Sequence, residues 1–314
     1  MSDETESKPS RKAPLAALGG AGVAIAAALL AVFISTGNKD KTEQPAPADG
    51  GEMVSVQSAG QGADTPPAPP ATPTADGVTA SADGALTYAD AAITFSAALP
   101  PGSETDPVLK PLRQQALEML AKYKADATAD MVERKRIGAP ALAWEVQLSW
   151  KELARAGGIA SLEGTFYEFT GGAHGMGSSA SHIARIGTGE ELKFADMLQG
   201  ARQPSPALII AMCEALKTEK LKRINSATIF DEPITCAGPN ANVKADEATI
   251  VLAPSNEPDR FGGLYVFYDP YAVGAYAEGG YTLTIPQQVF AEDLKPEFKK
   301  LFGGMAPPHP DEQN

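Results

Sequence analysis

The stretch FYEFTGGAHGM, residues 166–176, is the part of the sequence around which the fold is organised. Aromatic residues of high strand propensity enter it, and paired glycines then permit backbone angles that are closed to other residues. His174 lies between the pair Gly171 and Gly172 and a third glycine, Gly175. A histidine in so permissive a backbone is either presented to a ligand or tied to the carbonyl groups of its own turn. We favour the second role, and keep His174 and the three glycines as candidate ligand-binding residues.

The composition excludes several classes of function. With 314 residues the chain is long enough for one or two domains. A net charge of −13 and an isoelectric point near 4.8 argue against nucleic acid as a partner and are compatible with a basic protein. Two cysteines cannot form a four-cysteine zinc site, and three histidines leave little scope for a histidine-rich centre. We therefore predict no cofactor and no bound metal.

A histidine pair is the strongest metal alternative that the sequence offers. His174 and His182 are eight residues apart, so a hairpin could bring them together, with Glu168 or Asp196 as further ligands. The spacing matches no zinc motif such as His-Glu-x-x-His. For this reason we do not assign a metal site to them.

The N-terminal part predicts a membrane anchor and a spacer. Residues 1–14 form a short tail with basic residues, and an uncharged apolar stretch fills residues 15–36. Twenty such residues in a helix span roughly 30 Å, the thickness of the hydrocarbon core of a bilayer. The preceding basic residues favour an inner-membrane protein that crosses once, with its N-terminus inside and its main domain in the periplasm or outside the cell. Small residues after the span leave cleavage open, and we favour an uncleaved anchor. Residues 37–84 are rich in Pro and Ala and predict a disordered linker.

From residue 86 onward the periodicities predict an α+β fold with antiparallel β-sheets and two main helices. Asp106 followed by proline marks the start of the first helix, which continues to about Asp126. The second helix covers residues 206–221. The expected strands cover residues 93–98, 142–150, 159–169, 181–186, 191–194, 249–252, 264–268 and 281–285.

The two cysteines predict a disulfide. Cys213 lies in the second helix, and Cys236 lies in the segment that follows it. In an exported domain one disulfide between them is natural, and it would tie the helix to that segment. A catalytic thiol would need a base, which no sequence pattern identifies.

Tyrosines are concentrated between residues 265 and 281. Tyrosine is favoured at interfaces and on carbohydrate-binding surfaces. Packing within strands is the commoner explanation, and we adopt it here.

Residues 170–176, followed by TGEELKFADML at residues 188–198, resemble the extracytoplasmic domain of the RsiV-like family. That family has an aromatic-Thr-Gly-Gly-Ala-His-Gly segment, then a Thr-Gly with a hydrophobic-Asp-hydrophobic phrase. It occurs in the anti-sigma factor RsiV and ahead of the catalytic domain of PdaC-type peptidoglycan deacetylases. Residues 144–150, 267–273 and 279–286 are similar to further phrases of the family.

The resemblance covers about residues 86–290 and implies two modules. A PdaC N-terminal-like module would occupy residues 85–165, an RsiV-like C-terminal module residues 166–306, and a tail residues 307–314. In the family, RsiV binds lysozyme through its extracytoplasmic region, and PdaC-type enzymes add a separate deacetylase domain. This sequence has a cytoplasmic tail too short for a sigma-binding domain and no chain after Asn314 for a deacetylase.

These observations predict a membrane-anchored, non-catalytic binding module of the cell envelope. The expected partner is an envelope protein such as lysozyme, or a cell-wall glycan such as peptidoglycan. The alternative is a peptidoglycan deacetylase or hydrolase that acts through His174 and nearby carboxylates. A signalling subunit is a third alternative, for which the sequence has no motif.

Overall fold

The computed structural model describes residues 72–73, 77–81, 83–200 and 203–313, which all belong to one unit, residues 66–314. The predicted cytoplasmic tail, the membrane anchor and most of the linker lie outside these residues. Among the described helices, none is both long enough and apolar enough to cross a bilayer. The described residues form an α+β fold with four α-helices, two of them long, and an eight-stranded, a three-stranded and a two-stranded sheet.

The first sheet forms from strands that follow one another in the sequence, in the order β1 to β8. The expected antiparallel arrangement is confirmed in every pairing but one. Strands β4 and β5 are parallel, because the long helix α2 carries the chain back to the end of the sheet at which β4 began. The strands are β1 Thr72–Pro73, β2 Thr79–Ala80, β3 Leu86–Ala89, β4 Ile93–Ala98, β5 Trp144–Ala156, β6 Ile159–Phe169, β7 Met176–Arg185 and β8 Glu191–Leu192.

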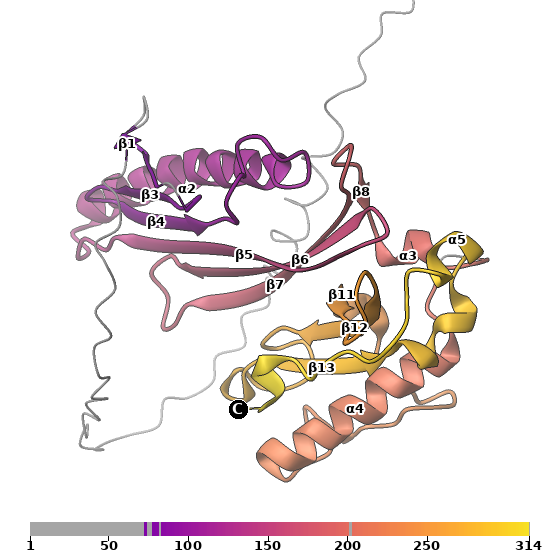
Figure 1. Cartoon of the computed structure of the whole chain (residues 1–314). Helices are drawn as coiled ribbons and strands as arrows, with labels where there is room; N and C mark the ends of the chain where they lie inside the picture. The colour runs from indigo at the N-terminus through magenta and orange to yellow at the C-terminus, as the bar shows by residue number, and fades with distance from the viewer. Residues whose placement is uncertain (1–71, 74–76, 82, 201–202, 314) are drawn as a thin grey trace, which may run out of the picture. The chain divides into compact units, whose positions relative to one another are not determined.

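Helix α2, Lys110–Ile137, covers one face of this sheet (Figure 1). In β4 every second residue from Ile93 is buried, and the alternate residues point to the other face. The helix begins four residues after the predicted N-cap, Asp106, whose carboxylate instead accepts a backbone N–H at 2.8 Å in the preceding turn. It ends at Gly138, whose left-handed φ of 72° favours glycine.

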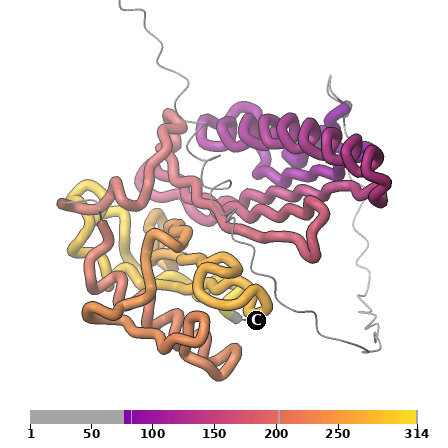
Figure 2. The backbone as a smooth tube through the Cα atoms, turned by 180° about the vertical axis from the view of Figure 1, so that it is seen from behind, coloured from indigo at the N-terminus to yellow at the C-terminus, as the bar shows by residue number. Residues whose placement is uncertain are grey.

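The second sheet is antiparallel in the order β11, β12, β13 and packs against the long helix α4 (Figure 1). Most buried apolar residues of both join a core that also takes Ile159 and Ile183 from the first sheet. A smaller, separate cluster contains Val251, Ala253, Tyr265 and Phe267 of β11 and β12. Seen from behind, the yellow C-terminal end of the chain lies beside the orange strands of this sheet (Figure 2). The remaining elements are α3 Phe194–Met197, α4 Pro206–Ile224, β9 Thr228–Ile229, β10 Glu232–Pro233, β11 Thr249–Pro254, β12 Phe261–Tyr268, β13 Tyr281–Pro286 and α5 Pro296–Lys299.

Strand β6 runs through the module boundary that we expected between residues 165 and 166. It pairs with β5 on one side and with β7 on the other. Its Ser161 hydroxyl also accepts the Leu252 N–H of β11 at 2.9 Å. The parts of the chain before and after the boundary therefore share this strand.

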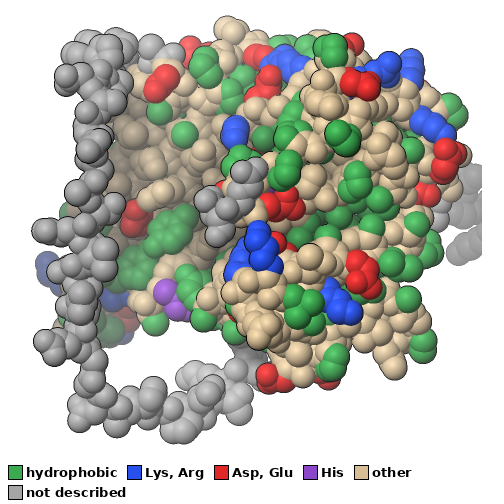
Figure 3. Space-filling model, turned by 60° about the horizontal axis from the view of Figure 1, so that its bottom comes forward, with side chains coloured by type: hydrophobic (Ala, Val, Ile, Leu, Met, Phe, Trp, Pro, Cys, Tyr) green, Lys and Arg blue, Asp and Glu red, His purple; other side chains and the backbone are tan. Residues whose placement is uncertain are grey.

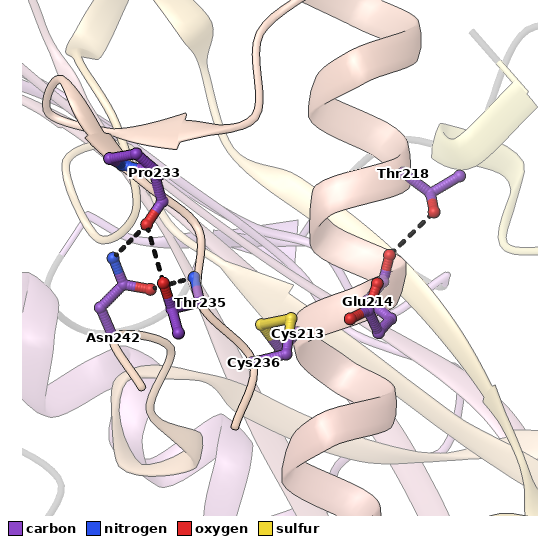
Figure 4. The surroundings of a disulfide bond; sticks show 7 residues. All are labelled: Cys213, Glu214, Thr218, Pro233, Thr235, Cys236 and Asn242. Atoms are coloured by element: carbon purple, nitrogen blue, oxygen red, sulfur yellow. Dashed lines mark hydrogen bonds between the residues drawn. A yellow bond between two sulfur atoms is a disulfide. The ribbon is translucent and has the colours of Figure 1, made fainter. Parts of the chain in front are cut away.

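The predicted disulfide is present. Cys213, fully buried in α4, is bonded to Cys236, which lies 23 residues further on (Figure 4). Beside it the Asn242 side chain accepts the Thr235 N–H at 2.9 Å and donates to the Pro233 carbonyl at 3.1 Å. The disulfide and this amide together fix the segment that follows β10.

Buried His182 is expected to make the stability of the fold depend on pH. Its Nε2–H donates to the Val108 carbonyl at 2.9 Å, and burial, opposed in part by that hydrogen bond and by Glu191, lowers the pKa of His182 below its ordinary value. Since the unfolded chain takes up a proton that the folded chain excludes, the free energy of unfolding should fall as the pH drops below about 6.5, by at most about 1.4 kcal/mol per pH unit. His182→Gln, which cannot titrate, should flatten this slope in urea titrations at neutral and mildly acidic pH. Equal slopes in the two proteins would contradict this account.

Candidate functional site

On the face of the first sheet opposite α2, the described residues leave β3, β4 and the adjoining ends of β5 and β6 uncovered, while β11 packs against the remaining length of β5 and β6. Because side chains alternate along a strand, polar residues between the buried ones point to this side. The register places Gln147 opposite Tyr167, and Ser149 opposite Thr165. We call this surface the open face. At one edge of it Glu145, two residues before Gln147 on β5 and thus on the same side, accepts a hydrogen bond from the Gln147 side chain at 2.6 Å. Its six central side chains, all exposed or half-buried, are Thr87, Ser96, Gln147, Ser149, Thr165 and Tyr167.

Two adjoining hollows occupy the open face. The larger, of about 240 Å³, is lined by all six of these side chains and by no residue with a charged side chain. The smaller, of about 160 Å³, lies toward Lys151, Glu163 and Asp311 and shares Ser149 and Thr165 with the larger. In Figure 3, which brings this side of the first sheet forward, neutral side chains predominate in the hollowed area. The open face therefore offers a neutral hydrogen-bonding centre with Glu145 beside it and a charged end toward Glu163.

The C-terminal segment closes the charged end. Residues 307–313 do not form the tail expected from their polar sequence: His309 is buried, and Pro310–Gln313 form a short 3-10 helix. The His309 ring donates from Nε2 to the Glu163 carboxylate of β6 at 3.1 Å. The backbone N–H of His309 donates to the Thr284 hydroxyl of β13 at 3.1 Å. These contacts hold the segment against both sheets.

Glu163, His309 and Asp311 also bring atoms that could bind a metal ion within 4.8 Å of one another. Their hydrogen bonds favour a different role. His309 Nδ1 accepts the Asp311 backbone N–H at 3.2 Å, and these partners assign the ring hydrogen to Nε2, which faces Glu163. A neutral imidazole binds a metal through a free nitrogen lone pair, and here both nitrogens are engaged. We therefore assign the hydrogen bond between Glu163 and His309 a structural role: it holds the C-terminal segment against the first sheet.

The central turn between β6 and β7 places His174 at the surface. The His174 ring stacks on Tyr276, with centroids 3.8 Å apart and planes inclined by 21°. Its Nδ1–H donates to the Gly175 carbonyl at 3.0 Å, and the Tyr276 hydroxyl donates to the same oxygen at 2.8 Å. His174 thus holds the turn, as favoured from the sequence, while its ring is also exposed.

Gly175 connects this turn to the open face. A Cβ atom at this position would overlap the Tyr167 hydroxyl and ring, so glycine is what allows Tyr167 to lie against the turn. Gly171 is required by the backbone conformation of the turn, because its φ of 100° is one that residues with a side chain rarely adopt. Gly172 has neither a positive φ nor a close neighbour. The structure thus separates the three candidate glycines by their physical roles.

The hairpin does not bring the other predicted metal ligands to His174. The His182 ring lies on β7 and is bonded to a backbone carbonyl before α2. Glu168 accepts the Tyr123 hydroxyl at 2.5 Å, and Asp196 accepts the Lys193 N–H at 3.1 Å. Each of these side chains is engaged elsewhere in the fold.

The loop between β12 and β13 carries a further exposed ring. Tyr271 is 49% exposed, has a φ of 73°, and lies with its ring centroid 5.4 Å from that of Tyr276. From beneath, fully buried Lys220 of α4 donates to a loop carbonyl at 2.7 Å and to the Glu278 carboxylate at 2.6 Å. Burial alone would raise the pKa of Glu278, but hydrogen bonds from Lys220 and Tyr281 hold it below its ordinary value. Sequence reasoning singled out the tyrosines of this region but gave no signal for which of them is exposed.

Replacing Gly171 and Gly172 by alanine should have different effects. Gly171→Ala forces a side chain into a left-handed backbone and against Arg134 and Leu142, which should lower the free energy of unfolding by about 1–3 kcal/mol. Gly172→Ala is the matched control next to it and should stay within about 0.5 kcal/mol of the wild type. Thermal or urea unfolding measures both. Equal effects at the two positions would show that the turn is not held by the backbone angle of Gly171.

Residues 89–177 match the sequence model of a family described as deacetylase PdaC. The resemblance to PdaC-type proteins is therefore confirmed for a part that runs from the end of β3 through the central turn, and the chain contains a PdaC-like domain. A crystal structure of a DUF3298-family protein from Pseudomonas aeruginosa PAO1 is 21% identical, with a TM-score of 0.41 and coverage of 68% of this chain and 87% of that chain. A DUF3298-family structure from Bacteroides fragilis NCTC 9343 is 15% identical, with a TM-score of 0.42 and coverage of 65% and 85%. No curated protein matches the chain.

Proposed function

We propose that this chain, with its PdaC-like domain, is a non-catalytic module of the cell envelope that binds a cell-wall glycan on the open face. The observation that carries the proposal is the larger hollow. Its lining combines hydroxyl groups, the Gln147 amide and the Tyr167 ring, without a charged side chain. A few placed polar groups around an otherwise uncharged concave surface are typical of small-molecule sites.

The chemistry of this lining suits a neutral saccharide. Hydroxyl and amide groups both donate and accept hydrogen bonds, as the hydroxyl and acetamido groups of an amino sugar do. An amphipathic tyrosine ring gives an apolar surface for the hydrogen-rich face of a sugar ring. A chain with a net charge of −13 would repel polyanions such as nucleic acids, but it does not repel an uncharged glycan.

The cellular location forms part of the proposal. Disulfides such as the one between Cys213 and Cys236 form and persist in oxidising compartments, of which the periplasm is one. The apolar segment at residues 15–36 would anchor the domain to the inner membrane, and the Pro-rich linker would hold it at a distance from the bilayer. A glycan-binding domain at that position would contact the cell wall.

Exchange of one glutamine tests the site against a closely matched control. Gln147 on the open face and Gln114 on α2 are both exposed, and each donates to a nearby glutamate, at 2.6 Å and 2.9 Å. The ligand is N-acetylated chitotetraose, called chitotetraose below. With this ligand and full-length protein in isothermal titration calorimetry, Gln147→Ala should weaken binding roughly five-fold, the value of a typical hydrogen bond. Gln114→Ala should leave the affinity unchanged.

Two results would reject the proposal. One is equal affinity in wild type, Gln147→Ala and Gln114→Ala, which would place the sugar elsewhere. The other is a wild-type protein that binds lysozyme but neither chitotetraose nor peptidoglycan. That second result would favour a protein-binding module in its place.

A further inference from the structure

We infer that the glycan site continues beyond the hollow onto a second subsite, formed by the rings of His174, Tyr276 and Tyr271, so that the ligand is a linear oligosaccharide rather than a single sugar. We call these three residues the aromatic platform. The inference rests on the proposed function and deepens it. It specifies that the ligand is an oligosaccharide and names the surface that only a longer oligosaccharide would contact.

The platform is assembled from two distant parts of the chain. His174 comes from the turn between β6 and β7, and both tyrosines come from the loop between β12 and β13. The His174 and Tyr276 rings are stacked, and the Tyr271 ring is inclined by 35° to that of Tyr276. His174 and Tyr271 are exposed and Tyr276 is half-buried. Aromatic rings normally bury such area, so their joint exposure at one place points to a ligand.

Backbone strain supports the same conclusion. A bulky residue in the left-handed region is uncommon. Such strained residues persist only where the surrounding structure holds them, and they cluster at functional sites. Tyr271 occupies this region while its ring stays half in solvent. The buried pair Lys220–Glu278 and the hydrogen bond from Tyr281 to Glu278 at 2.6 Å hold the loop that imposes the strain.

The platform is continuous with the hollow through Gly175. On one side Tyr167, which lines the hollow, lies against Gly175. On the other side the Tyr276 hydroxyl donates to the Gly175 carbonyl. The charged end of the open face lies toward Glu163, four residues along β6 from Tyr167 and thus about 13 Å away. A sugar chain that leaves the larger hollow at its Tyr167 end, where the turn at Gly175 lies, would therefore meet the platform next.

The exposed area of the platform also argues for a glycan and against a protein surface. A stable protein interface takes about 800 Å² from each partner. Three rings, of which one is half-buried, supply only a small part of such an area. A sugar chain can be bound through a smaller area, by single aromatic rings or polar groups that contact its successive sugar units.

A length series of N-acetylchitooligosaccharides tests the inference with full-length protein. Wild-type affinity should rise from the trisaccharide to the hexasaccharide, because only the longer ligand reaches the platform. Tyr271→Gly removes the ring and relieves the backbone strain. It should weaken binding of the hexasaccharide roughly three- to ten-fold and leave binding of the trisaccharide unchanged. Its melting temperature should not fall below that of the wild type, because glycine tolerates a positive φ.

Phe230 provides the matched control. It is 55% exposed with a φ of 47°, but it lies in the turn between β9 and β10. Phe230→Gly should therefore be as well tolerated as Tyr271→Gly and should leave the affinity for every ligand unchanged. If Tyr271→Gly weakens short and long ligands equally, or weakens neither, the platform is not a subsite and the inference is wrong. If the wild type binds no member of the series, the proposed function itself fails, and the inference fails with it.

Discussion

Lys220→Met should lower the free energy of unfolding by about 3–5 kcal/mol, the usual cost of breaking a buried ion pair. The substitution keeps an unbranched side chain, shorter by one atom, but removes the donor to Glu278 and to the Val273 carbonyl. Glu278 would then keep a charge in a partly buried site without its cation. Urea unfolding measures this loss of stability. The loop that carries Tyr271 should lose its support as well, and faster protease cleavage of this loop would be a second readout.

Two controls distinguish the effect of losing the ion pair from the general effect of replacing a lysine in α4. Lys217→Met lies one turn earlier in the same helix and should change stability by no more than about 0.5 kcal/mol. The double variant Lys220→Met with Glu278→Gln should be more stable than Lys220→Met alone, because it no longer contains an uncompensated carboxylate. A loss below about 1 kcal/mol for Lys220→Met would mean that the pair does not hold the loop.

Removal of the disulfide should be the second large effect. In the chain-entropy model, a bond that joins positions 23 residues apart stabilises by roughly 3 kcal/mol at room temperature. The double variant Cys213→Ala with Cys236→Ala should therefore lose about this much in urea unfolding. Alanine is chosen because Cys213 is fully buried and a serine hydroxyl there would add a second cost.

Reduction of the wild type provides an independent check on the same bond. Labelling of denatured, non-reduced protein should detect no free thiol. Reduced wild type and the double alanine variant should show similar losses of stability. Two reactive thiols in the native protein, or a double variant as stable as the wild type, would contradict the pairing.

The sequence was informative wherever the determinants are local. The alternation of apolar and polar residues from Ile93 predicted β4. The proline after Asp106 predicted the start of α2, although the helix begins at Lys110, slightly later in the chain. The glycines around His174 predicted a turn at the end of a strand, which is where the structure has it. Such elements depend on periods and backbone angles that neighbouring residues specify.

What the sequence did not predict depends on pairings between distant residues. The sequence of residues 307–313 is polar and has no period, so its packing could not be read from it. Glu163, the partner of His309, lies 146 residues earlier in the chain. The open face likewise exists only because the strand register puts Gln147 beside Tyr167. Sequence reasoning therefore located the central turn but missed the surface that this turn borders.

The most direct test of the central claim is a map of where a glycan touches the protein. In an NMR titration of full-length protein with chitotetraose, we expect the backbone amide shifts to change most on the open face. The residues expected to respond are Thr87, Ser96, Gln147, Ser149, Thr165 and Tyr167, while amides of α4 should stay constant. Shift changes confined to other surfaces, or no change at saturating sugar, would contradict the account.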